Sequence, residues 1–138
     1  MEGIGAMKLN LHKTNERDRI LFNELYDEKK YSIGGIRRIE SISFEDYVDL
    51  LWIGAIDPKD RQNSAPTAEE IMKFVGAHPN FYAFGYAVSP LRDDCRVSIE
   101  GVACTEEYRL QDVWDFFEVF QYPDELTVQK GLLRCWYD

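Results

Sequence analysis

The chain has 138 residues, with 25 acidic against 16 basic side chains and a formal net charge of -9. An acidic balance of this size excludes non-specific binding to nucleic acid or to an anionic membrane surface, because both require a basic footprint. Hydrophobic residues make up 45% and aromatic residues 14%, which fits one folded domain with its own core.

The sequence shows no pattern typical of a targeting signal. No apolar run approaches the 18 or so residues of a membrane span, and no charged-then-apolar leader is visible. We therefore expect a cytoplasmic protein with a single domain over residues 1–138. Residues 1–7 carry no clear pattern and are interpreted as disordered or as an expression remnant.

The first predicted helix covers residues 14–29, where Thr14 or Asn15 supplies the N-cap. Its apolar side consists of Ile20, Leu21, Phe22 and Leu25. In residues 31–42 an isoleucine recurs every third position, but the Gly34-Gly35 pair disfavours a regular helix. We predict a turn at these glycines followed by a short strand.

Two further helices are predicted from N-cap signals. Ser43 starts one, with Asp46 at the capping-box position, and Thr67 starts the other, with Glu70 completing the box. The polar residues 57–66 between them are interpreted as a loop. The first of the two helices has a wide apolar side, made of Phe44, Tyr47, Val48, Leu51 and Trp52.

Residues 81–104 are expected to form a hairpin around which the fold is organised. Two stretches rich in aromatic and β-branched residues flank a polar cluster in which Asp93 and Asp94 are interpreted as turn residues. The predicted register pairs Val88 with Cys95, Tyr86 with Val97, Phe84 with Ile99, and Tyr82 with Gly101. This register puts the bulky side chains on one face, which we take as the nucleus of the core. On the opposite face lie Ala83, Gly85 and Ala87, and a helix of the same chain is expected to cover them.

An amphipathic helix over residues 105–120 and a last strand over residues 125–137, kinked at Gly131, complete the chain. The apolar side of the helix is predicted to consist of Leu110, Val113, Trp114, Phe117 and Phe120. The fold class is therefore α+β, with a small, largely antiparallel sheet built around the 81–104 hairpin and the C-terminal strand, and with helices packed on it.

Catalytic and metal-binding patterns are absent from the sequence. Only His12 and His78 are present, without ligand spacing, and His78 is expected on the surface. There is no phosphate-binding glycine loop and no nucleophile elbow. The three cysteines are expected to be free thiols in a reducing compartment, and the acidic residues near Cys95 and Cys104 are expected to raise the pKa of these two thiols. No cofactor, metal or catalytic residue is assigned, and an enzyme is the less favoured interpretation.

Acidic residues are concentrated near the C-terminus. Between residues 105 and 125 seven carboxylates are opposed by Arg109 alone, so a net charge of -6 falls in 21 residues. A row of acidic residues along one helix face is often only a solvated surface, but it can also dock against a basic surface of another protein. The residues assigned to partner binding are Glu106, Glu107, Asp112, Asp115 and Glu118.

The leading hypothesis is a non-enzymatic acidic interaction domain that docks this helix face into the basic, nucleic-acid-binding groove of a partner protein and so inhibits that partner. Direct binding of nucleic acid or membrane is not expected, and the oligomeric state stays open. One alternative is a small-ligand-binding protein or enzyme with a pocket between helices and sheet. Another is a structural subunit whose hairpin edge or last strand pairs with a copy of itself.

Overall fold

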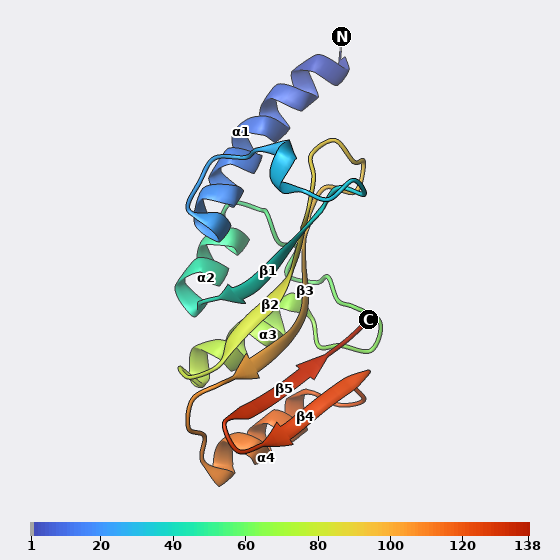
Figure 1. Ribbon diagram of the computed structural model, residues 1–138. Helices are drawn as coiled ribbons and strands as arrows, with labels where there is room; N and C mark the ends of the chain where they lie inside the picture. The colour runs from blue at the N-terminus through green and yellow to red at the C-terminus, as the bar shows by residue number, and fades with distance from the viewer. Residues whose placement is uncertain (1) are drawn as a thin grey trace.

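The computed structural model describes the backbone of residues 2–138 and the side chains of residues 11–138. Its α-helices are α1 (Glu2–Phe22), α2 (Phe44–Trp52), α3 (Ala68–Ala77) and α4 (Leu110–Val119). Its strands are β1 (Ile36–Ile42), β2 (Tyr82–Val88), β3 (Val97–Cys104), β4 (Glu125–Gln129) and β5 (Leu132–Trp136). The strands form one antiparallel sheet in the order β1-β2-β3-β5-β4 (Figure 1). The α+β prediction is confirmed. The interpretation of residues 1–7 as disordered or as an expression remnant stays a prediction, because the side chains there and the whole of residue 1 lie outside the described part of the chain.

The N-caps of α2 and α3 are the ones that the sequence predicts. The Ser43 hydroxyl accepts a hydrogen bond from the backbone N–H of Asp46, and Thr67 and Glu70 form a reciprocal capping box. These side chains satisfy backbone donors that the first helical turn leaves without partners. Residues 57–66 form the predicted loop between the two helices.

The prediction for the first helix is wrong at both ends. Helix α1 starts well before Thr14, which is buried inside it rather than capping it. The helix stops at Phe22 because Asn23 adopts a left-handed conformation with φ of 57°. Leu25, predicted on the apolar side, lies beyond the helix and is 53% exposed.

The predicted turn and short strand in residues 31–42 are confirmed as a turn at Gly35, with φ of 82°, followed by β1. The C-terminal prediction is wrong, because residues 125–137 form two strands rather than one kinked strand. Gly131, also at φ of 82°, makes a tight turn that reverses the chain between β4 and β5.

The hairpin of β2 and β3 exists, but its predicted register is wrong. Tyr86 pairs with Ser98, and Phe84 pairs with Gly101. A bulge between these two pairs leaves Glu100 as an extra residue in β3. A change of one residue in the pairing exchanges the faces of one strand relative to its partner. The β2 part of the expected core face, Tyr82, Phe84 and Tyr86, therefore lies on the solvent side of the sheet, whereas Val97 and Ile99 of β3 are buried in the core, as predicted.

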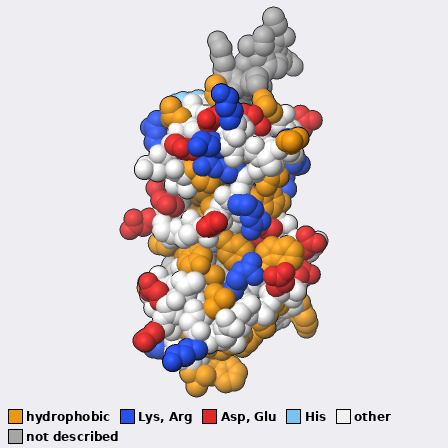
Figure 2. All heavy atoms as spheres, in the orientation of Figure 1, with side chains coloured by type: hydrophobic (Ala, Val, Ile, Leu, Met, Phe, Trp, Pro, Cys, Tyr) orange, Lys and Arg blue, Asp and Glu red, His pale blue; other side chains and the backbone are white. Residues whose placement is uncertain are grey.

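The solvent face of the sheet carries aromatic rings covered by arginines. The Arg134 guanidinium carbon lies 4.8 Å from the centroid of the Phe84 ring. Glu100, 7% exposed, accepts hydrogen bonds from Arg38 and from the indole N–H of Trp136. Figure 2 shows hydrophobic side chains mixed with charged ones over the middle of this face. The aromatic side chains of β2, which the predicted register had placed in the core, therefore lie in a solvent-side layer with paired polar groups.

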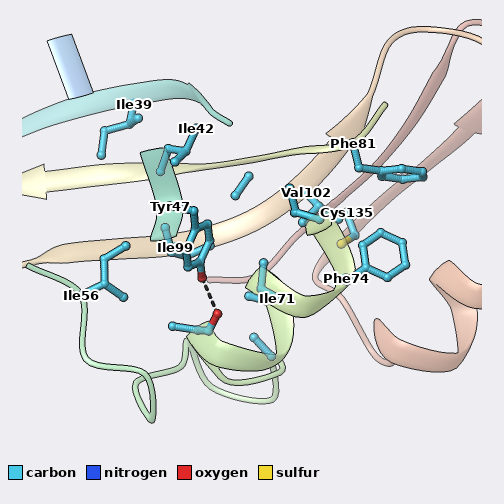
Figure 3. Close-up of a cluster of buried hydrophobic side chains, with 14 of the residues drawn as sticks. Ile39, Ile42, Tyr47, Ile56, Ile71, Phe74, Phe81, Ile99, Val102 and Cys135 are labelled. Atoms are coloured by element: carbon cyan, nitrogen blue, oxygen red, sulfur yellow. Dashed lines mark hydrogen bonds between the residues drawn. The ribbon is translucent and has the colours of Figure 1, made fainter. Parts of the chain in front are cut away.

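The core lies on the small-residue side of β2 and not on its bulky side, where the nucleus was predicted. The prediction that a helix of the same chain covers Ala83 and Ala87 is confirmed, and both are fully buried. Helices α2 and α3 pack there against branched side chains of β1 and β3 (Figures 1 and 3). Tyr47 of α2 is fully buried, and its hydroxyl donates a 2.6 Å hydrogen bond to the carbonyl of Ala68 in α3. Small residues on β2 allow these helices to approach the sheet closely.

Candidate functional site: an acidic groove between α3 and α4

Helix α4 is anchored to the body by an aromatic cluster. Phe116 and Phe120 are buried, and their rings lie 6.4 Å and 4.9 Å from that of Phe74 in α3, centroid to centroid. Phe81, just before β2, joins the same cluster. The helix is therefore fixed to α3 and to the start of β2 through rings that come from one of its sides.

The predicted apolar side of α4 is only partly buried. Val113 and Phe120 face the body, but Leu110 is 71% exposed, Trp114 61% and Phe117 39%. The helical wheel misassigned these residues because apolar side chains occupy two sides of α4, and the side that carries Phe116 is the one packed on Phe74.

Asp112 is used to start the helix. Its carboxylate accepts a 2.8 Å hydrogen bond from the backbone N–H of Arg109 and forms a 3.6 Å ion pair with the guanidinium of the same residue. The Asp112 side chain is only 14% exposed. This carboxylate therefore has a structural role at the N-terminus of α4.

Asp115 joins α4 to the end of α3. One carboxylate oxygen lies 2.9 Å from Nε2 of His78, and the other accepts a 2.8 Å hydrogen bond from Gln111. The other ring nitrogen of His78 lies 2.8 Å from the carbonyl oxygen of Phe74. The hydrogen bond from His78, with that from Gln111, lowers the pKa of Asp115.

His78 is a correction to the sequence analysis, which expected it on the surface. Its side chain is only 12% exposed, and its ring stacks on that of Phe74 at 4.0 Å between centroids. The proline that follows it had suggested an open turn. The residue instead caps α3 and packs beneath α4.

The remaining predicted binding residues, Glu106, Glu107 and Glu118, are exposed. None of their carboxylates makes a hydrogen bond or ion pair with another side chain in the part of the chain that the structure describes. The predicted set of five therefore divides into two structural carboxylates, Asp112 and Asp115, and three that face solvent unpaired.

The acids border a groove that the sequence did not predict. One hollow lies between α3 and α4, a second continues from it toward Tyr108, and His78 lines both. Phe74, Phe81 and Val119 provide apolar surface along these hollows. Their charged lining consists of Glu70, Glu107, Asp112, Asp115 and Glu118 against Lys73 and Arg109.

No competing reactive centre appears elsewhere among the described residues. They contain no cluster of three or more side chains suited to a metal ion, and all three cysteines are free, as predicted. Burial raises the pKa of the Cys104 thiol and raises that of Cys135 to about 12, so neither favours the reactive thiolate. Asp94 accepts from Arg92 and Arg96 in the turn after β2, as expected for a turn residue.

Compared with family models, curated proteins and solved structures, the chain matches none. Across its described residues no helix is long and apolar enough to cross a membrane.

Proposed function

We propose that this protein is a non-enzymatic interaction domain that binds a basic segment of a partner protein in the groove between α3 and α4. The observation behind the proposal is the lining of that groove, in which five carboxylates face two basic side chains over an apolar floor. Local charge of one sign attracts and orients a partner of the opposite sign, while apolar surface supplies contact energy.

The geometry favours a different docking mode from the one expected from the sequence. The acids border a hollow of this protein, so a basic side chain of the partner enters the groove, instead of α4 entering a groove of the partner. Glu107 and Glu118 sit in the two connected hollows and have no described side-chain partner. We assign them the direct contacts, with Glu106 as a neighbouring contribution to the field.

The partner is defined by its chemistry: a lysine- or arginine-bearing segment with apolar residues beside the charges. A nucleic-acid-binding protein fits this description, and covering its basic surface would inhibit it. Free thiols fit a reducing compartment such as the cytoplasm, where we place this interaction.

The proposal is tested by affinity capture with two matched variants. The tagged protein is incubated with lysate at low salt, eluted with a salt step, and the eluate is identified by mass spectrometry. The test variant is Glu107→Lys with Glu118→Lys. The control is Glu45→Lys with Asp49→Lys, two exposed acids of α2 whose reversal changes the net charge equally.

We expect one defined basic protein to be retained by the native chain and by the α2 variant, and to be lost from the groove variant. Its release by salt follows from screening of exposed charges over about 8 Å at physiological ionic strength. Loss of the partner from both variants would show that only overall charge matters, and retention by both would show that the groove carboxylates are not needed. Either result would contradict the proposal.

A further inference from the structure

A second surface remains exposed on the opposite side of α4 from the groove. At 100° per residue, Leu110, Trp114 and Phe117 share one side of the helix, whereas Asp115 and Glu118 lie on the side toward α3. The three apolar side chains are 71%, 61% and 39% exposed. Hydrophobic side chains are also visible at the lower end of the molecule in Figure 2, where α4 and β4 lie.

Strand β4 extends this apolar surface. Leu126 pairs with Cys135 and Val128 with Leu133, and both β5 residues are fully buried on the helix side of the sheet. Residues that pair across strands share a face, so Leu126 and Val128 also point to the helix side. They are nevertheless 46% and 47% exposed, because α4 does not cover them.

In the described part of the chain β5 is the only strand that pairs with β4, so the outer edge of β4 has no partner strand. Such an edge presents backbone N–H and C=O groups that can pair with another strand. Proteins commonly protect an edge with charge, proline or a bulge, yet β4 reads Glu-Leu-Thr-Val-Gln with no bulge in its pairing to β5. The hydroxyl of Tyr108, two residues before α4, donates to the carbonyl of Gln129, so the start of α4 lies close to the end of β4.

We propose that two copies of this chain associate through β4, in antiparallel orientation about Thr127, to form one continuous ten-stranded sheet. This register pairs all five residues of the strand, with Leu126 opposite Val128 of the second copy and Glu125 opposite its Gln129. It also sets Asp124 against Lys130 of the second copy, on both sides of the two-fold axis. Opposite charges meet and no like charges do, so the strand is complementary to itself.

The same two-fold axis places the α4 helices of the two copies side by side beneath the joined sheet. Leu110, Trp114 and Phe117 would then meet their counterparts, and tryptophan is among the side chains that contribute most to interfaces. The groove between α3 and α4 lies on the other side of each helix and stays open. The association is therefore independent of the proposed binding of a basic partner.

Solution mass measured by light scattering over a range of protein concentrations tests the association. A single chain has a mass of 16.1 kDa, so the native protein is expected to approach twice that value as concentration rises. Trp114→Glu and Val128→Lys each replace an exposed side chain, so folding should be unchanged, which circular dichroism checks. Each is expected to raise the dissociation constant of the dimer about tenfold or more.

Trp52→Glu is the matched control, because Trp52 is 90% exposed on α2, away from this surface, and its substitution should leave the dimer intact. Lys130→Glu tests the register, because it sets two acids against each other, and its weakening effect should fade at high salt. A chain that stays monomeric at every concentration would overturn the proposal. A dimer that tolerates both Trp114→Glu and Val128→Lys would overturn it as well.

Discussion

At the scale of single residues, the contact between His78 and Asp115 should make stability depend on pH. Hydrogen bonds from His78 and Gln111 hold the pKa of Asp115 below its ordinary value of about 3.9. The stabilisation is therefore complete above that value and is lost as pH falls through the lower folded pKa. Asp115→Asn should lower the free energy of unfolding at pH 7, and the difference from the native chain should be smaller at pH 3. Urea unfolding at both pH values measures this, and a deficit that is equal at both would contradict it.

The buried hydroxyl of Tyr47 is a second single-residue determinant. It donates to the carbonyl of Ala68 inside the core, so Tyr47→Phe leaves that acceptor without this donor. We expect a loss of about 1–3 kcal/mol in the free energy of unfolding. Tyr82→Phe is the control, because Tyr82 is half-buried on the solvent face of the sheet, and its change should be close to neutral in the same denaturant titration.

At the scale of elements, Gly85 explains how β2 and β3 approach at the bulge. A Cβ atom at this position would lie 1.9 Å from the carbonyl oxygen of Ser98, which belongs to the backbone and cannot turn away. Gly85→Ala should therefore cost about 3 kcal/mol or more, at the upper end of overpacking effects. Gly34→Ala, with nothing nearer than 3.9 Å, should be tolerated. Equal melting temperatures for the two variants would contradict the description of the bulge.

The helices and strands also show which features can be predicted from local sequence. The caps at Ser43 and Thr67 are local hydrogen bonds, and they were predictable because nothing distant competes with them. The register of the central hairpin could not be predicted in this way. Matching bulky residues with bulky ones gave a plausible pairing, but the sequence does not reveal the bulge at Glu100 that shifts it. Four of the five predicted acidic residues line the two hollows, but the groove also depends on Phe74 of α3 and on His78, which caps that helix, and only the tertiary fold brings these close.

At the scale of the whole molecule, a buried charged network fixes α1 to the sheet. Arg17 donates to Asp18, to the carbonyl of Val88 and to the hydroxyl of Tyr31, which itself donates to Asp18. Asp18→Asn removes the counter-charge of a guanidinium that is only 3% exposed and should cost roughly 3–5 kcal/mol. Glu69→Gln, in an exposed pair with Lys73, should cost less than about 1 kcal/mol. Chemical denaturation compares the two, and similar losses would contradict a buried anchor.

The central claim, that the groove between α3 and α4 receives a basic segment, is tested most directly by nuclear magnetic resonance. The ¹⁵N-labelled protein is titrated with a synthetic helical peptide that alternates lysine and leucine at helical spacing, at low and at physiological salt. We predict saturable shifts centred on His78, Glu107 and Glu118, and an affinity that falls with salt and with Glu107→Lys and Glu118→Lys together. Shifts spread evenly over all acidic surfaces, or no saturable shifts in the groove, would contradict the claim.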